Sequence, residues 1–271
     1  MLLPRIITAL IGIPVILGIV HTGSLPYALF ITLIIMFSAY EYHLILKLGG
    51  KQVQRVPLYI FSVLMTAAII LDRSPLRPVE GDNLASLAII SVLLGCMCWE
   101  MFSKTLSLER IALTVFGIFF IPWTLAHMVL IRDIRPDGEF IVYTVLVTVW
   151  IMDTAAYAAG RSWGKTKLAE LVSPKKTWEG AVAGFAAAVV TVLIMRKLFL
   201  SDTMTNATAM TTGFLIGVIG QVSDLAESVI KRTAGVKDSS NLLPGHGGVL
   251  DRFDSYLLLA PALYYFLILI R

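Results

Sequence analysis

The chain has 271 residues, of which 57% are hydrophobic and 15% are charged, with a net charge of +4. Soluble domains carry about 25% charged residues, and here the apolar residues form runs long enough to span a bilayer. These features exclude an ordinary soluble protein. The small positive charge is typical of a membrane protein with basic cytoplasmic loops, so we expect no nucleic-acid partner.

Nine apolar segments predict membrane helices, which makes the expected fold all-α and polytopic. The segments cover residues 5–21, 26–46, 57–71, 84–102, 111–131, 140–159, 179–199, 209–230 and 253–270. No small-x-small cleavage site follows the first segment, so we expect an uncleaved helix there. We divide the chain into N-terminal transmembrane helices (1–135) and C-terminal catalytic helices with cytoplasmic loops (136–271), within one continuous membrane domain.

The loop charges predict the orientation of these helices. If the N-terminus is cytoplasmic, the inner loops contain 15 of the 22 Lys and Arg residues. Cytoplasmic loops of membrane proteins are enriched in these residues. The same orientation places the two most basic loops, after the sixth and eighth segments, on the cytoplasmic side.

Carboxylates inside predicted spans are the first indication of a functional site. We assign the charges of the first half of the chain to loops, whereas Asp153 lies within 140–159 and Asp224 and Glu227 lie within 209–230. A charged side chain at the centre of a membrane helix costs roughly 2.5–3.5 kcal/mol. Alternatively, each acid could form a purely structural ion pair with a lysine. The clustering of the acids favours a functional role.

The eighth segment carries a polar stripe. Its helical spacing puts one set of residues on the same face, namely Gly217, Gln221, Asp224, Ser228 and Lys231. A charged stripe cannot face lipid, so it predicts an aqueous cleft that opens to the cytoplasm.

The long loop 233–250 contains Lys237 and Asp238, followed by His246 among glycines that include Gly247 and Gly248. Glycines permit unusual backbone angles and close approach of a ligand, and successive N–H groups can hold an anion. A plain flexible loop is the alternative. The acids and bases around it favour a role in binding phosphate.

The final segment begins with Asp251, Asp254 and Ser255 at spacings that share a helix face. With Asp224 and Glu227 on the preceding segment, the number of acids exceeds what helix capping needs. Carboxylate oxygens suit Mg²⁺ held jointly with substrate phosphates. Zinc is disfavoured, because His246 is the sole histidine of this region and no cysteine is near it.

The other basic loop predicts a helix that begins at Ser173 and Pro174. Lys175 and Lys176 would lie in its first turn, where the helix dipole disfavours positive charge. A bound anion at this helix end would offset the clash. The alternative is a basic interface loop that Trp178 anchors in the membrane.

These motifs closely resemble a family signature, that of the phosphatidate cytidylyltransferases or CDP-diacylglycerol synthases. The matching positions are Ser228-x-x-Lys231-Arg232, Lys237-Asp238, Pro244-Gly245-His246-Gly247-Gly248-x-x-Asp251-Arg252-x-Asp254 and Ser173-Pro174-Lys175-Lys176-Thr177-x-Glu179-Gly180. The resemblance covers residues 150–255. One departure is Ser223, which stands before Asp224 where the family usually has glycine.

The resemblance implies that CTP and phosphatidic acid react with Mg²⁺ to give CDP-diacylglycerol and pyrophosphate, with a second cation left open. The expected catalytic residues are Asp224, Asp251, Asp254, His246, Lys231, Arg232, Lys237 and Asp238. The expected metal ligands are Asp224, Glu227, Asp251, Asp254 and Asp153. The expected nucleotide-binding residues are Ser173, Lys175, Lys176, Thr177, Glu179, Gly247, Gly248 and Arg252.

Two other function classes remain as alternatives. A polyprenyl-phosphate sugar-1-phosphate transferase also uses membrane-embedded acids and Mg²⁺, but it does not explain the motif around His246. A cation or proton transporter explains the buried acids, yet no internal repeat is visible. We expect a multi-pass protein of the bacterial inner (plasma) membrane. A homo-oligomer such as a dimer is compatible with the sequence, which leaves the oligomeric state open.

Overall fold

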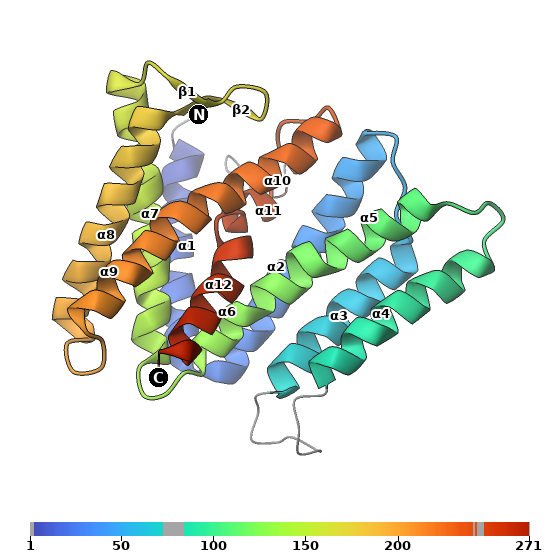
Figure 1. The fold of residues 1–271 in the computed structure, drawn as a ribbon, viewed down its shortest axis with the longest axis horizontal. Helices are drawn as coiled ribbons and strands as arrows, with labels where there is room; N and C mark the ends of the chain where they lie inside the picture. Colours follow the sequence, from blue (N-terminus) through green and yellow to red (C-terminus); the bar gives the residue numbers. More distant parts are fainter. Residues whose placement is uncertain (1–2, 73–83, 241, 243–246, 271) are drawn as a thin grey trace. The chain divides into compact units, whose positions relative to one another are not determined.

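A computed structural model describes residues 3–72, 84–240, 242 and 247–270, with the backbone alone for residues 3–9. Helices dominate this part of the chain (Figure 1). The elements are α1 (Leu3–Thr22), α2 (Ser24–Leu48), α3 (Arg55–Asp72), α4 (Leu84–Met101), α5 (Leu108–Ile118), the π-helix η1 (Phe119–Trp123), α6 (Thr124–Arg132), α7 (Gly138–Trp163), β1 (Lys167–Ala169), β2 (Ser173–Thr177), α8 (Trp178–Phe199), α9 (Asn206–Leu215), the π-helix η2 (Ile216–Gly220), α10 (Gln221–Thr233), α11 (Leu250–Phe253) and α12 (Tyr256–Leu269).

Eight of the nine predicted membrane helices are confirmed. Among the described residues, eight helical stretches are long and apolar enough to cross a membrane, and a shorter apolar helix covers Leu10–Thr22. Three of the eight are composite: α5 continues through η1 into α6, α9 continues through η2 into α10, and α11 is followed by α12. The protein is therefore an all-α polytopic membrane protein, with one small β-hairpin.

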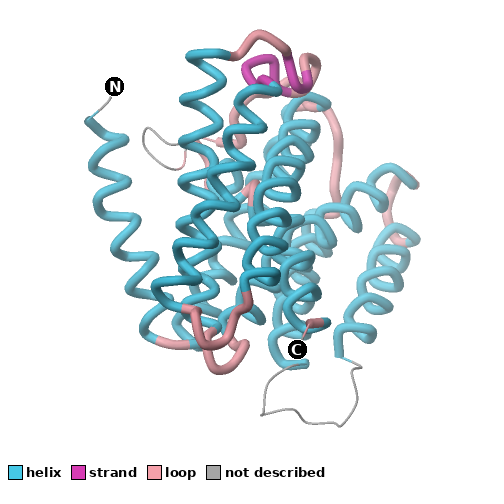
Figure 2. The backbone as a smooth tube through the Cα atoms, turned by 60° about the vertical axis from the view of Figure 1, so that its left-hand side comes forward, coloured by secondary structure: helices cyan, strands magenta, loops and turns pink. Residues whose placement is uncertain are grey.

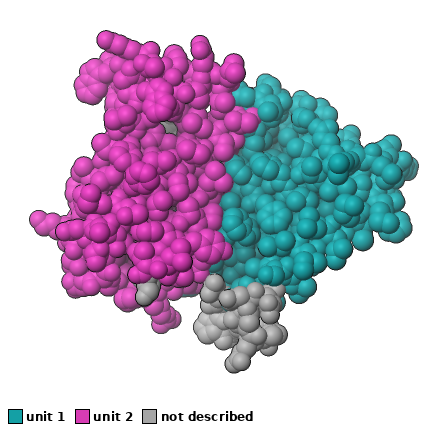
Figure 3. Space-filling model, in the orientation of Figure 1, with its two compact units in different colours: residues 1–130, 230–253 teal, residues 131–229, 254–271 magenta. Residues whose placement is uncertain are grey.

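The chain forms two compact units (Figure 3). Unit 1 contains residues 1–130 and 230–253, and unit 2 contains residues 131–229 and 254–271. The division of the chain at residue 135 stays a prediction. The glycine loop and Asp251 fall in unit 1, with the N-terminal helices.

In unit 1, α3 packs against α2, α4 and α5. Polar contacts around Glu100, a buried side chain at the end of α4, join this end to the starts of α3 and α5. Its carboxylate accepts hydrogen bonds from the side chain of Gln54 (2.7 Å) and the N–H of Ser107 (2.7 Å), and it pairs with Arg110. Burying such a group is tolerated because its partners satisfy both oxygens.

In unit 2, α7 and α8 pack closely, and the β1–β2 hairpin lies at one end of this pair (Figures 1 and 2). Glycine allows the close approach, because a Cβ added to Gly180 would lie 2.6 Å from the carbonyl oxygen of Ala156. Small residues at helix contacts are common in membrane proteins, where close packing replaces the hydrophobic effect. The short chain between the two helices forms the antiparallel β1–β2 hairpin.

One local prediction is wrong. Ser173 and Pro174 do not begin a helix: they lie in β2, which pairs antiparallel with β1 (Lys167 opposite Thr177), and the helix begins at Trp178. The final predicted span corresponds to Leu250–Leu269, with an interruption between the end of α11 at Phe253 and the start of α12 at Tyr256.

Candidate active site

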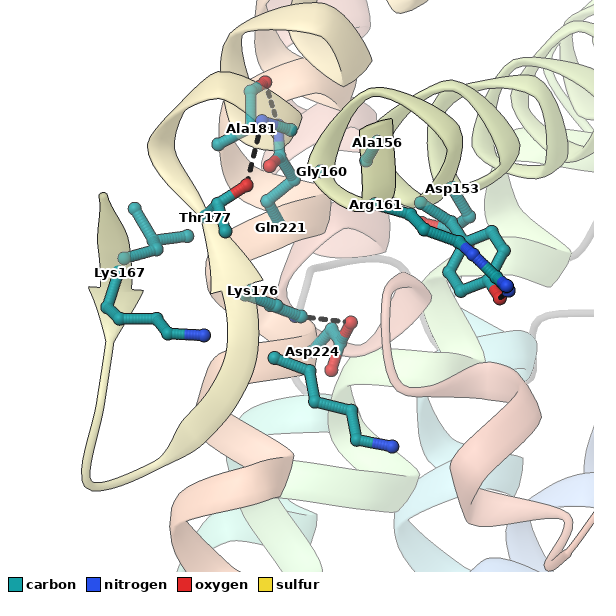
Figure 4. A pocket seen from close by; sticks show the side chains of 14 residues that line it. Asp153, Ala156, Gly160, Arg161, Lys167, Lys176, Thr177, Ala181, Gln221 and Asp224 are labelled. Atoms are coloured by element: carbon teal, nitrogen blue, oxygen red, sulfur yellow. Dashed lines mark hydrogen bonds and ion pairs between the residues drawn. The ribbon is translucent and has the colours of Figure 1, made fainter. Parts of the chain in front are cut away.

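Unit 2 contains a cavity of about 510 Å³ where α7, α8, α10 and the hairpin meet (Figure 4). The described residues that line it are Asp153, Ala156, Tyr157, Gly160 and Arg161 of α7, Lys167 and Leu168 of β1, Lys175, Lys176 and Thr177 of β2, Gly180 and Ala181 of α8, and Gln221 and Asp224 of α10. Four of these side chains are basic and two are acidic. The lining thus carries a positive excess, which suits an anionic ligand.

The hairpin positions the lysines of the cavity. Lys175 and Lys176 lie on β2, and Lys167 lies opposite the end of this strand on β1. Thr177 then caps α8, since its hydroxyl accepts a hydrogen bond from the N–H of Gly180 (3.2 Å). Glu179 accepts the N–H of Thr166 (3.1 Å), which ties the start of the hairpin to α8. Lys175 and Lys176 therefore reach the cavity from a strand, and the predicted first-turn position is corrected.

Asp224 points into the cavity and forms an ion pair with Lys176 (Nζ to Oδ2, 2.5 Å; Figure 4). Both side chains are partly exposed, at 28% for Lys176 and 26% for Asp224. One turn earlier, the Gln221 side chain donates to the carbonyl oxygens of Ala181 (3.1 Å) and Gly217 (2.6 Å). Gln221 and Asp224 of the predicted polar stripe face the cavity, and the π-helix η2 ends directly before Gln221.

The other half of the stripe is used differently. Ser228 is buried and does not line the cavity, and Lys231 pairs in unit 1 with Asp251 (2.7 Å). Glu227 is buried as well. Of the predicted metal ligands, the structure brings Asp153 and Asp224 to one cavity, from α7 and α10.

Ser223, the departure from the family pattern, connects α10 to the break before α12. Its hydroxyl donates to the carbonyl oxygen of Asp254 and accepts from the N–H of Leu258 (3.0 Å). These two backbone groups are four residues apart and would bond to each other in an uninterrupted α-helix. An inserted hydroxyl of this kind bends or breaks a helix. It accounts for the interruption at Asp254 and Ser255.

In unit 1, Asp251 is the centre of the predicted signature. Besides Lys231, it accepts hydrogen bonds from the N–H groups of Ser239 (3.0 Å) and Gly248 (2.9 Å). Gly247 has a positive φ of 81°, which glycine adopts without strain. Two described residues of the signature, Lys231 and Gly248, thus bond to Asp251.

The remaining predicted residues have varied surroundings. Lys237, Asp238 and Arg252 are exposed, and Arg232 donates to the carbonyl oxygen of Val236 (3.0 Å). Asp254 accepts from the N–H of Ser255 (2.6 Å). The prediction for His246 lies outside the described residues, and Ser173 is half-buried on β2 and does not line the cavity.

Glu41 is a residue that the sequence analysis missed. It lies within the predicted span 26–46, contrary to the assignment of first-half charges to loops, and it is fully buried in α2. Its partners are four donors near the glycine loop, namely Ser239, Ser240, Val249 and Leu250. A carboxylate inside an apolar span was the available signal.

The described residues contain no group of three or more His, Cys, Asp or Glu side chains arranged to hold a metal ion. Mg²⁺ does not require such a group, because proteins usually bind it through one or two carboxylates together with substrate phosphates and water. Asp153 and Asp224 provide two carboxylates in a cavity that also has basic side chains for the phosphates. The donor set therefore fits a magnesium–polyphosphate ligand.

Comparison with known proteins identifies the family of this chain. The chain matches the family described as "Cytidylyltransferase family" over residues 3–270. A phosphatidate cytidylyltransferase of Bacillus subtilis (strain 168) is 31% identical over 265 residues, which cover 98% of this chain and 97% of that protein. Another, of Staphylococcus haemolyticus (strain JCSC1435), is 34% identical over 267 residues, covering 97% and 98%. A third, of Synechocystis sp. (strain ATCC 27184 / PCC 6803 / Kazusa), is 41% identical over 135 residues, covering 50% and 45%. The chain belongs to the cytidylyltransferase family.

Proposed function

We propose that this protein transfers the cytidylyl group of CTP to phosphatidic acid, which yields CDP-diacylglycerol and pyrophosphate for phospholipid biosynthesis. The observation that supports this most directly is the cavity of unit 2, where basic side chains surround the Lys176–Asp224 pair within a bundle of membrane helices. A basic, partly enclosed site suits a triphosphate, and the apolar helices suit the acyl chains of a lipid substrate.

In the proposed reaction, a phosphate oxygen of phosphatidic acid forms a bond to the α-phosphorus of CTP. The bond from this phosphorus to the oxygen that bridges to the β-phosphate breaks, and the electron pair leaves with pyrophosphate. The attacking oxygen is already anionic, so a strong general base is not needed. The main barrier is the approach of two anions, which positioning and charge neutralisation lower.

The residues of the cavity have distinct parts in this scheme. Lys175, Lys176 and Lys167 bind phosphate oxygens as charge-assisted donors. Lys176 then shares its ammonium group between Asp224 and the nucleotide. In unit 1, Lys231 pairs with Asp251, which stays a predicted site residue.

Mg²⁺ is part of the proposal, with Asp153 and Asp224 as its carboxylates in the cavity. When bound, the ion neutralises phosphate charge and polarises the bond to the leaving group. Asp251, Asp254 and Glu227 stay as further predicted ligands, and a second cation stays open. The loop charges support a cytoplasmic N-terminus, and relatives of bacterial origin support a location in the bacterial inner membrane.

A double-label experiment tests the function. The purified protein is incubated with phosphatidic acid, Mg²⁺ and CTP labelled on either the α- or the γ-phosphate. We expect the α-label in the lipid fraction and the γ-label in pyrophosphate. Absence of α-label from the lipid would overturn the proposal, and transfer of sugar phosphate from a UDP-sugar to polyprenyl phosphate would favour the other transferase class.

A further inference from the structure

We infer that Glu41 of α2 is a positioning residue that holds the signature segment around Gly248 and Asp251 in its working conformation. Only the expected change in kcat rests on the proposed cytidylyl transfer; the contacts of Glu41 do not. The site is made of described residues from both halves of the chain, all within unit 1.

Four hydrogen-bond donors converge on the two oxygens of Glu41. Oε1 accepts from the hydroxyl of Ser240 (2.5 Å) and the N–H of Val249 (2.9 Å). Oε2 accepts from the hydroxyl of Ser239 (3.0 Å) and the N–H of Leu250 (2.7 Å). Each oxygen therefore accepts from one hydroxyl at residues 239–240 and one backbone N–H at residues 249–250. A single side chain thus binds both sides of the glycine loop.

The geometry requires a carboxylate. In a glutamine, the amide nitrogen would replace one acceptor oxygen and would face the N–H of either Val249 or Leu250. Two donors would then oppose each other in a buried site, whichever way the amide is turned. Glutamine has nearly the same size and shape as glutamate, so this substitution changes the hydrogen bonding with little change in packing.

Gly248 provides an independent observation. A Cβ at this position would lie 1.8 Å from the Ser239 hydroxyl oxygen and 2.6 Å from Oε2 of Glu41. The glycine thus makes room for Glu41, while its own N–H donates to Asp251 (2.9 Å). Through these contacts Glu41 fixes the backbone that supports Asp251, and hence the pair of Asp251 with Lys231.

Glu100 offers a matched control within unit 1. It is likewise buried (4% exposed, against 0% for Glu41). It also accepts four hydrogen bonds, from Gln54, Ser107 and two nitrogen atoms of Arg110. None of these partners belongs to the signature. Glu41→Gln and Glu100→Gln therefore apply the same chemical change to a signature-bound and a purely structural carboxylate.

The test measures kcat, KM for CTP, thermal stability and amide hydrogen exchange in the full-length protein. We expect both variants to lower the melting temperature. Only Glu41→Gln should lower kcat per folded molecule, by roughly tenfold to a hundredfold. It should also accelerate exchange of the peptide that contains Val249 and Leu250 by about tenfold or more.

Ser240→Ala removes one donor with little risk to folding, and it should change kcat and exchange in the same direction by a smaller factor. Exchange that is unchanged in Glu41→Gln and Ser240→Ala, or an equal fall in kcat for the Glu100→Gln control, would overturn the role of Glu41. If the wild-type protein shows no cytidylyl transfer, the proposed function fails. The exchange measurement still tests whether Glu41 holds the segment that contains Val249 and Leu250.

Discussion

Glu41 and Glu100 of unit 1 have different surroundings from Asp224 of unit 2. In unit 1, Glu41 and Glu100 each accept four hydrogen bonds from protein donors and are buried. In unit 2, Asp224 is 26% exposed, pairs with Lys176 and borders a cavity together with Asp153. A carboxylate whose acceptor positions are filled by protein donors organises a loop, whereas one that faces a cavity is available to a ligand. For Glu41, Glu100 and Asp224, the number of protein donors therefore separates the acids that hold protein segments from the acid that can bind a ligand.

The strongest test of this comparison is Asp224→Asn. The substitution keeps the size of the side chain and removes the charge, so we expect kcat to fall by roughly 10²–10³-fold, the scale of losing one preorganised electrostatic group. The melting temperature in detergent should change little, because the side chain is partly exposed. Asp202→Asn, at an exposed acid of unit 2 outside the cavity, serves as the control. Near-normal turnover of Asp224→Asn would remove this aspartate from the binding acids.

A second test concerns the hairpin lysine. Lys176→Ala should raise KM for CTP by roughly tenfold to a hundredfold, since a hydrogen bond to a charged group contributes about 1.5–3 kcal/mol. Initial rates at varied CTP concentration measure the effect. The control is Lys197→Ala. Lys197 lies in the last turn of α8, at the opposite end from the cavity, so its loss should leave KM unchanged. Unaltered CTP dependence in Lys176→Ala would mean that the cavity does not bind the nucleotide.

Ser223→Ala should have a moderate effect. The substitution removes the hydroxyl that bonds both the Asp254 carbonyl and the Leu258 N–H. A buried group that loses its partner costs about 1–3 kcal/mol, so thermal unfolding should occur at a lower temperature, with a few-fold loss of kcat. Ser201→Ala, at an exposed hydroxyl of the same unit, is the control. If Ser223→Ala unfolds at the wild-type temperature, the inserted hydroxyl has no stabilising role.

The smallest expected effect is that of Thr177→Ala. Loss of this helix cap should destabilise the protein by about 1 kcal/mol, measured as a lower melting temperature. Thr177→Ser retains the hydroxyl that accepts from Gly180 and should behave like the wild type. Equal destabilisation by serine and alanine would show that packing of the threonine methyl group matters more than the cap.

The candidate site was predicted in part. Asp224, Asp153 and the lysines of 173–180 were selected from charge within or beside apolar segments, and they line one cavity. The local signal at Ser173 and Pro174 was misleading, because β2 exists only through its pairing with β1. Strand propensity depends strongly on such context.

Glu41 and Ser223 show a second kind of limit. Glu41 bonds to Ser239 across 198 positions in sequence, and Ser223 bonds to the backbone of Asp254 across 31. No periodicity within one segment encodes such a contact. The carboxylate of Glu41 was visible inside a span, but its partner segment was not.

The membrane helices follow directly from the amino-acid sequence, because the length and hydrophobicity of a segment are local properties that the bilayer selects. The residues of the candidate-site motifs are also visible in the sequence. The role of each acidic side chain depends on the hydrogen-bond donors that other segments bring to it. Asp224 pairs with Lys176, and Glu41 accepts from the N–H groups of Val249 and Leu250. Tertiary structure thus distinguishes a carboxylate that holds a loop from one that faces a ligand, because hydrogen bonds are short and directional and form only after the segments have packed.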